Sequence, residues 1–594
     1  MALLRKLLGL LLLPIVVQAH GSPKADIRAD TNRDGLVDLA GDSDLNGKSH
    51  WTETRGALFL PNIGDTDRRC SREALVGPRL SNARLDDCHD AADDIQRAPE
   101  LMAVVRTVPM SGLSSNATGS ISIAEEVARD NVRIFRPDGS SWVYVGSNHT
   151  FGQDELTAGL TLGVDGRDTR RPGGWDGRVT LQFTVRQGDW HSSDTVQLRV
   201  APVLVHHHLQ RVGQVLAVRG NASASPWVDR YSHDLALVVR EAGLAADIHL
   251  FETGEDVWVQ DFVEPGFATM PGPDGPVAIR IMIRSPQDER VAGRQLFESF
   301  RRSGVGAVQH LGGANEEINS GGNVEAVPPH SLNGRAWPAG RVLMGAHGAR
   351  QHHLLPYLQA QETQEPILLD TDWLAIGHVD EFLQFLPADT ERGWVAMVDD
   401  PRAAIDLLRT LRDEGHGGLH ALSRNESRTP RGCNGWGCDP APVPATTIEQ
   451  LLSDEKLMQV NLRCADRIDA NLDILKREVG LTDDAVLRIP ALFRNHPFPE
   501  EEGPEVTQAT LKVGAFFPGA VNNLVLTGFR TCVAPNPWGP SPNGTDVLAE
   551  AIRRQYAKLG IEIKFIDDWT SHHVEGGEVH CGSNTLRDMS QPWW

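Results

Sequence analysis

The sequence predicts a two-part protein, with a β-sandwich in residues 20–202 and a larger domain of mixed helices and strands in residues 203–594. Three observations support this prediction. A chain of 594 residues exceeds what one hydrophobic core normally organises. Between residues 100 and 200, short runs of alternating apolar and polar residues recur between turn residues. After residue 203, similar strands alternate with amphipathic helical segments.

The composition excludes some classes of protein. With 40% hydrophobic and 23% charged residues, the chain is typical of a folded protein and not of a disordered one. The 57 lysines and arginines and the 79 acidic residues give a net charge of −22. Because this charge repels a phosphate backbone, we expect no nucleic-acid partner. Cationic substrates and metal ions are the expected partners of such an acidic chain.

The first residues have the pattern of a signal peptide. Arg5 and Lys6 precede the apolar residues 7–17, and Val17-Gln18-Ala19 resembles a cleavage site. We therefore expect residues 1–19 to be removed and the protein to be secreted; the alternative is an uncleaved anchor. No later run reaches about 18 apolar residues, so we expect no stable membrane insertion.

The next segment is rich in acids that could bind Ca²⁺. Residues 30–35 fit the pattern D-x-N-x-D-G, and residues 42–47 repeat it. Alternate oxygens of such a loop can face one centre, and hard oxygen ligands favour Ca²⁺. The candidate ligands are Asp30, Asn32, Asp34, Asp38, Asp42, Asp44, Asp65 and Asp67. The alternative is a solvated acidic turn.

The sandwich is predicted from strands such as residues 141–145, 179–185 and 195–200, and Ala201-Pro202-Val203 marks its end. Beyond it, Asp546 can cap a helix that ends by Gly560, and residues 561–566 alternate as a strand. Residues 462–475 predict another helix, with a break at Gly480. The region is α/β or α+β, and a repeated architecture would explain its size.

Four segments carry residues suited to chemistry. Asp261 ends an apolar run, His378 and Asp380 stand two apart, Cys581 follows a short alternating run, and residues 320–325 form a Gly-rich loop that ends in Glu325. Two carboxylates could hold a planar guanidinium, and a thiolate could attack its central carbon. An imidazole could protonate the departing nitrogen and then activate water. These residues would convert a guanidinium to a ureido group and ammonia.

The same segments resemble the protein-arginine deiminase family, calcium-dependent enzymes that convert arginine in proteins to citrulline. The resemblance rests on ordered motifs at residues 258–261, 320–325, 377–382, 515–518, 537–540 and 577–584. It implies an Ig-like, calcium-binding domain in residues 20–202 and a pentein-type α/β-propeller in residues 203–594. The implied partners are arginine-containing proteins or peptides.

The resemblance also implies individual roles. Cys581 would be the nucleophile, His378 the general acid and base, and Asp261 and Asp380 the guanidinium ligands. Trp258 would line the arginine channel, and Arg290 lies near the family's arginine that grips the substrate backbone. The implied calcium ligands near the active site are Gln260, Glu264 and Glu325, with the carbonyl groups of Gly322 and Val324.

Two departures from the family pattern leave alternatives open. Phe262 and Arg284 stand where a second calcium site of the family has acids, so that site is expected to be absent. The spacing near Arg290 is shifted, and so a deiminase of free arginine or of a small guanidine remains an alternative to one acting on peptides. A third possibility is a calcium-binding surface protein without catalysis.

Secretion affects the interpretation of the seven cysteines. We expect Cys581 to be unpaired and the other six to form three disulfides. Cys433 and Cys438 enclose a Gly-rich stretch and could close a small loop.

Overall fold

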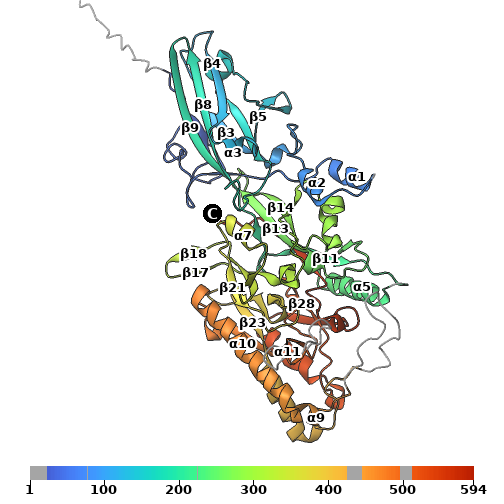
Figure 1. The fold of residues 1–594 in the computed structure, drawn as a ribbon. Helices are drawn as coiled ribbons and strands as arrows, with labels where there is room; N and C mark the ends of the chain where they lie inside the picture. The colour runs from blue at the N-terminus through green and yellow to red at the C-terminus, as the bar shows by residue number, and fades with distance from the viewer. Residues whose placement is uncertain (1–22, 77, 224, 425–444, 496–511) are drawn as a thin grey trace, which may run out of the picture.

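The computed structural model describes residues 23–594 except 77, 224, 425–444 and 496–511 (Figure 1). The predicted signal peptide and the predicted loop between Cys433 and Cys438 lie outside these residues. The chain forms a mainly β part with a few short helices at one end and a larger mixed part below it in this view.

Two sheets make up the N-terminal part. One has the order β1 (Ile27–Ala29), β3 (Ala103–Thr107), β7 (Thr161–Gly166), β5 (Val132–Asp138) and β6 (Ser141–Tyr144). The other has the order β2 (Ala57–Phe59), β9 (Trp190–Val200), β8 (Arg178–Gln187) and β4 (Thr118–Ile123). Side chains of both sheets, such as Val164 and Phe183, share one apolar core. The three strands predicted here are confirmed as β6, β8 and β9.

Among the described residues, the larger part contains five sheets with one common plan: two antiparallel strands and a third strand parallel to the second. Their strands are β13 (Val263–Met270), β14 (Val277–Arg284) and β15 (Val305–Gln309); β16 (Val324–Val327), β19 (Arg341–His347) and β21 (Ile367–Asp370); β22 (Leu383–Pro387), β23 (Trp394–Asp400) and β24 (Val486–Pro490); β27 (Leu524–Leu526), β28 (Thr531–Pro535) and β29 (Glu562–Ile566); and β30 (Asn584–Arg587), β11 (Val212–Val218) and β12 (His249–Phe251). The chain therefore repeats one unit, as its size suggests.

The fifth sheet joins the two ends of this region. β30 from the C-terminal segment pairs antiparallel with β11, and β12 pairs parallel with β11. Short strands extend or flank the sheets: β10 (Leu204–Val205), β17 (His330–Leu332), β18 (Arg335–Trp337), β20 (Arg350–Gln351), β25 (Phe493–Asn495) and β26 (Val513–Ala515). Because β30 follows the Cys581 segment directly, this pairing anchors that segment against the first strands of the region.

Helices connect the strands throughout the chain, and the longer ones lie on the outside of the larger part (Figure 1). They are α1 (Arg69–Leu75), α2 (Asn82–Asp87), α3 (Glu126–Arg129), α4 (Gln153–Ala158), α5 (Pro226–Glu241), α6 (Val259–Phe262), α7 (Leu355–Ala360), α8 (Pro401–Leu411), α9 (Ile448–Ser453), α10 (Glu455–Val479) and α11 (Val547–Ala557). Asp546 caps α11 through the amides of Leu548 and Ala549, as predicted. Gly480 ends α10 with φ 65°, also as predicted. Within the described residues, no helix is both long and apolar enough to span a bilayer.

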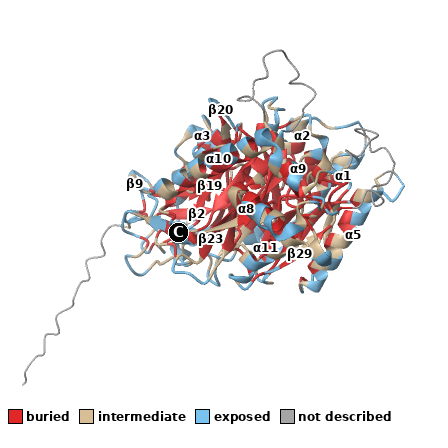
Figure 2. Ribbon diagram, turned by 90° about the horizontal axis from the view of Figure 1, so that it is seen from below, coloured by how far each residue is buried: buried red, intermediate tan, exposed pale blue. Residues whose placement is uncertain are grey.

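The predicted boundary at Ala201–Val203 separates two sheets but not two cores. β9 ends at Val200, and β10 then pairs with β13 of the larger part. The apolar cluster nevertheless continues across it, from Val200 through Leu204 to Phe267. Figure 2 shows buried residues throughout the interior and exposed ones on the surface.

The cysteine prediction is partly wrong. Cys70 and Cys88 form a disulfide, which ties α1 to the end of α2. Cys464 and Cys532 are buried and free, as is Cys581. Cys464 packs in one apolar cluster and Cys532 in another, so each behaves as a small core residue.

Candidate active site

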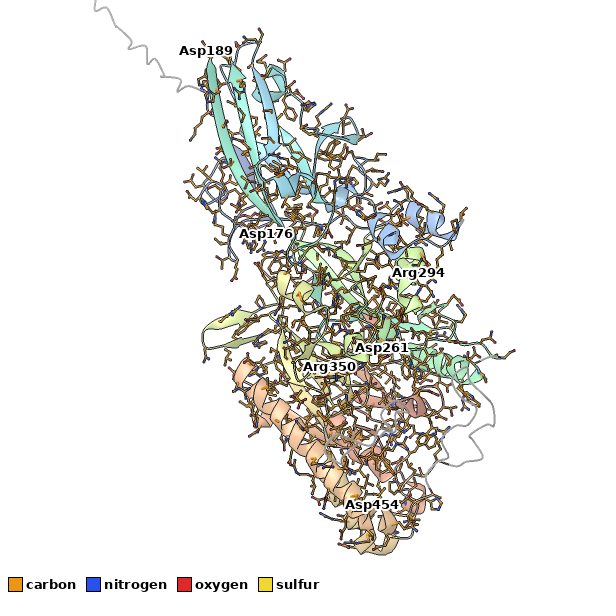
Figure 3. All side chains as sticks on the ribbon, in the orientation of Figure 1. Asp176, Asp189, Asp261, Arg294, Arg350 and Asp454 are labelled. Carbon is orange, nitrogen blue, oxygen red and sulfur yellow. A yellow bond between two sulfur atoms is a disulfide. The ribbon has the colours of Figure 1, made fainter. Side chains whose placement is uncertain are left out.

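The short helix α6 (Val259–Phe262) positions the first candidate acid, Asp261. The amide of Gln260 donates to the carbonyl of Cys581 at 3.1 Å, so α6 is fixed against the cysteine segment. The Asp261 side chain is buried. Its label in Figure 3 marks its position within the larger part of the molecule. Burial raises the pKa of Asp261 to about 6, against the opposing attraction of Arg290 and His378.

His378 and Asp380 are held at a tight turn, the 3₁₀ segment Val379–Glu381. The carboxylate of Glu381 accepts the amides of Gly377 and His378 at 2.9 and 2.8 Å. His378 Nε2 lies 2.9 Å from the carbonyl oxygen of Glu317, which can only accept, so Nε2 donates. Nδ1 of His378 has no hydrogen-bond partner and lies 3.8 Å from Oδ1 of Asp261.

The electrostatics of His378 favour a charged ring. Burial alone would lower its pKa, but the carboxylates of Asp261 and Asp380 outweigh it and the pKa is raised. Since Nδ1 is free of other contacts, this atom can hold or deliver a proton in the space between the two acids.

Gly322 faces the point where these groups converge. A Cβ atom placed on Gly322 would lie 2.8 Å from Nδ1 of His378, 3.1 Å from Oδ2 of Asp380 and 3.2 Å from Oδ1 of Asp261. The other oxygen of Asp380, Oδ1, is buried without a partner, as is Oδ1 of Asp261. Buried unpaired carboxylate oxygens are costly, and a cationic donor would satisfy both. The absence of a side chain at Gly322 lets these three groups lie this close to one another.

Cys581 is next to this space. Its Sγ lies 3.7 Å from Oδ2 of Asp380 and accepts a hydrogen bond from Nδ2 of Asn522 at 3.2 Å. Burial, with the charges of Asp380 and Asp261, raises the thiol pKa well above its usual value. A cation between the two acids would remove part of this penalty, because it would neutralise the charges that oppose a thiolate.

Sequence reasoning missed two polar residues that hold the cysteine segment. Asn522 also accepts the amides of His580 and Cys581 at 3.1 and 3.2 Å. His580 Nδ1 lies 2.8 Å from Oδ2 of Asp380, and its Nε2 lies 3.7 Å from Oε1 of Glu325. His580 could have been noticed from its place beside Cys581. Nothing in the sequence near Asn522 indicates its role.

The predicted calcium ligands of this region partly come together. Gln260, Glu264, Val324 and Glu325 line one cavity of about 20 Å³, which suits a single ion or water. Burial and repulsion by Glu325 raise the pKa of Glu264 well above its usual value. Burial and the charge of Asp380 raise the pKa of Glu325 to about 7, against the opposing effect of His580. Oε1 of Gln260 is buried without a partner. Two buried carboxylates and an unpaired amide oxygen fit a hard divalent cation such as Ca²⁺. The α-carbon of Gly322 faces the catalytic groups, and the role of its carbonyl group as a calcium ligand stays a prediction.

The N-terminal acids are arranged differently. Asp44 accepts the amides of Thr31, Asn32 and Asp38, and Asp65 accepts the amides of Cys70 and Ser71 at the start of α1. The carboxylate of Asp30 accepts hydrogen bonds from the amides of Asp34 and Gly35. The carboxylate of Asp34 accepts one from the amide of Leu36. The carboxylate of Asp38 accepts two, from the amides of Ala40 and Gly41. Asn32 donates to Asp34, Asp67 pairs with Arg97 at 3.4 Å, and Asp42 is exposed. In the ranges that the structure covers, no three acids of this segment bring ligand oxygens within 4.8 Å of one another.

The two predicted substrate-binding residues lie beside the site. Trp258 contacts the ring of His572 edge-on, with centroids 5.1 Å apart, and a Cβ on Gly577 would touch both Trp258 and Cys581. The Arg290 guanidinium pairs with Asp256 at 3.0 Å and with Asp261 at 3.4 Å. In this structure Arg290 therefore contacts the acid predicted to bind substrate.

The comparisons with known proteins point to one family. The model of the family described as Protein-arginine deiminase (PAD) matches residues 190–594. Protein-arginine deiminase type-4 of Rattus norvegicus is 31% identical over 418 residues, 68% of this chain and 56% of that protein. Protein-arginine deiminase type-3 of Homo sapiens is 29% identical over 605 residues, 94% of this chain and 82% of that protein. The chain thus spans little more than half of the type-4 protein.

Solved structures are less similar. The agmatine deiminase of C. jejuni aligns with a TM-score of 0.32 and 12% identity, over 66% of this chain and 97% of its own. The N-terminal domain of an arginine dihydrolase from cyanobacteria aligns with a TM-score of 0.31 and 12% identity, over 63% and 98%. Such TM-scores are too low to carry an argument.

Proposed function

We propose, because this chain belongs to the protein-arginine deiminase family, that it hydrolyses the guanidinium group of arginine in peptides to citrulline and ammonia. One observation carries the proposal. Atoms of Asp261, Asp380 and His378 converge in front of Gly322, and the Cys581 thiol lies 3.7 Å from Oδ2 of Asp380.

The two acids would bind the substrate. A guanidinium is planar and remains charged at every physiological pH, and its N–H groups match carboxylate oxygens. Oδ1 of Asp261 and Oδ1 of Asp380 are the unpaired acceptors that such a group would satisfy. Their burial strengthens the attraction, since little water screens it.

Cys581 would attack the central carbon of the bound guanidinium. The thiol, whose Sγ lies 3.7 Å from Oδ2 of Asp380, passes its proton to that carboxylate and the new C–S bond forms. The charged His378 gives its proton to the departing nitrogen, and the C–N bond breaks to release ammonia. Water, deprotonated by His378, then attacks the covalent amidino-cysteine, and the C–S bond breaks to release the ureido product and the thiol. The free Nδ1 of His378 supports its assignment as the proton carrier.

We further propose that the cavity beside Gln260 holds Ca²⁺, with Glu264 and Glu325 as carboxylate ligands. The ion would neutralise two buried acids. Gln260 is adjacent to Asp261, and the backbone amide of Gln260 donates to the carbonyl oxygen of Cys581. A calcium ion bound by the Gln260 side chain would therefore hold α6, and with it Asp261, in its position beside Cys581. The N-terminal acids are a second proposed calcium region.

We propose that the two N-terminal sheets form an Ig-like domain and that the five repeated sheets form a pentein-type α/β-propeller. The pairing of β30 with β11, which joins both ends of the repeat, supports this assignment.

Secretion is proposed from the basic and apolar residues at the start of the chain. The Cys70–Cys88 disulfide supports it, because such bonds persist in oxidising compartments. Expression of the full chain, followed by N-terminal sequencing of the protein in the medium, tests the proposal. A protein retained with its first 19 residues would contradict it.

The decisive experiment measures citrulline and ammonia from a peptide with one internal arginine, from free arginine and from agmatine. Each is tested with Ca²⁺ and with a chelator, and the Cys581→Ala variant is the control. We expect turnover of the peptide with Ca²⁺ and at least about a 10³-fold loss in Cys581→Ala. Turnover of the small guanidines alone would identify the alternative deiminase. No turnover of any substrate would favour a calcium-binding protein without catalysis.

A further inference from the structure

Three of the buried side chains that line the proposed calcium cavity form a group with two imidazoles, which calcium does not prefer as ligands. Among the described residues, His208, Glu325 and His580 are the only His, Cys, Asp or Glu side chains that bring ligand atoms of three residues within 4.8 Å of one another. Nε2 of His208 lies 4.0 Å from Oε2 of Glu325, and Nε2 of His580 lies 3.7 Å from Oε1. Imidazole nitrogen is a ligand for Zn²⁺ and similar metals, whereas Ca²⁺ takes oxygen.

The outer nitrogens of both rings are already engaged. Nδ1 of His208 lies 3.2 Å from the carbonyl oxygen of Phe385, and Nδ1 of His580 lies 2.8 Å from the Asp380 carboxylate. Both partners are acceptors, so Nδ1 carries the proton in each neutral ring. Nε2 then has a free lone pair, and in both rings it is the nitrogen nearest Glu325. Metal-binding histidines typically have this arrangement, in which an outer acceptor fixes the ring and its tautomer.

The surroundings favour an occupant. His208, Glu325 and His580 line the same cavity as Gln260, whose Oε1 is buried without a partner. Ligand atoms around a tetrahedral Zn²⁺ are roughly 3.3 Å apart. The three ligand atoms lie within 4.8 Å of one another, so each distance between them would have to shrink by no more than about 1.5 Å. Rotation of the side chains can supply a movement of this size.

We propose that His208, Glu325 and His580 form a binding site for Zn²⁺ or a similar transition metal. Glu325 is also a proposed calcium ligand, so the two metals would exclude each other. His580 bonds directly to Asp380, so a metal on His580 would be one residue away from the guanidinium-binding acid. The exclusion of calcium rests on the proposed function, whereas the metal site rests on the three side chains alone.

The test uses the full chain with Cys581→Ala, since the thiol would otherwise compete for zinc. Zn²⁺ affinity is measured by competition with a chromophoric chelator, and Co²⁺ absorption reports the ligand type. We expect His208→Asn to weaken Zn²⁺ binding at least about tenfold. The exposed His233→Asn should leave the affinity unchanged. Added Ca²⁺ should weaken Zn²⁺ binding in the parent, because both metals would use Glu325.

A second readout guards against misfolding of the variant. Zn²⁺ should raise the thermal midpoint of the parent and of His233→Asn, because the metal binds the folded state. It should not raise that of His208→Asn or His208→Gln. Equal zinc affinity in the parent and the His208 variants, or a Co²⁺ spectrum with thiolate bands that persists in them, would overturn the site. Neither result depends on arginine turnover, so failure of the proposed function would leave this test intact.

Discussion

The two acid-rich regions of the chain differ in what their oxygens contact. In the N-terminal segment, Asp30, Asp44 and Asp65 accept backbone amides and thereby shape the loop. In the larger part, Asp261 and Asp380 each keep one buried oxygen without a partner, close to a thiol and an imidazole. Density of acids in the sequence therefore does not locate chemistry. Here the site is marked by buried acids with an unpaired oxygen that also lie beside a thiol and an imidazole, because a bound cation would offset the cost of burying them.

Asp261→Asn should have the largest effect. Loss of the negative charge removes half of the proposed guanidinium clamp, and we expect kcat/KM for the peptide to fall about 10²- to 10³-fold. The matched control is the exposed Asp42→Asn in the other region, which should stay near the parent value. Steady-state kinetics measures both. A threefold loss or less in Asp261→Asn would remove this acid from the clamp.

Gly322→Ala should act by filling the convergence point. The added methyl would lie 2.8 to 3.2 Å from His378, Asp380 and Asp261, where the substrate group is expected. We expect about a 10²-fold loss of kcat/KM, since overpacking costs about 1–3 kcal/mol. Gly418→Ala, which meets no atom within 4 Å, is the control. Parent-like kinetics for Gly322→Ala would place the substrate elsewhere.

Asp44→Asn should instead change stability. Asp44 is fully buried and accepts three backbone amides, and an asparagine would turn a donor toward some of them. We expect the free energy of unfolding to fall by about 2 kcal/mol. The exposed Asp42→Asn should change it by less than about 0.5 kcal/mol. Denaturant unfolding is the measurement; equal midpoints for both variants would show that the loop does not depend on Asp44.

Acidic pH should weaken ligand binding at the catalytic acids. Burial raises the pKa of Asp261 to about 6, so the carboxylate is charged above that pH and neutral below it. In Cys581→Ala, which cannot turn the substrate over, the Kd of an arginine peptide should rise about tenfold per pH unit below 6. In Asp261→Asn combined with Cys581→Ala, this dependence should be lost. A flat profile in the Cys581→Ala protein would contradict the role of Asp261.

Several features followed from the sequence because they depend on local patterns. Asp546 and Gly480 were recognisable as helix ends, and the alternating run at residues 195–200 as a strand, because caps and strand periodicity are local properties. The motifs around Asp261, His378, Asp380 and Cys581 were recognisable for the same reason. The cysteine pairing was not: counting residues cannot show that Cys464 and Cys532 lie in separate clusters.

The side chains suited to chemistry, the alternation of strands and helices, and the family were recognisable from local patterns in the sequence. Three features depend on the folded chain: which acids stay unpaired, that Asn522 holds the cysteine segment, and that His208 meets His580 near Glu325. The physical reason is distance along the chain. Hydrogen bonds and desolvation act over a few ångströms, and residues 208, 325, 522 and 580 come that close only when the five sheets assemble.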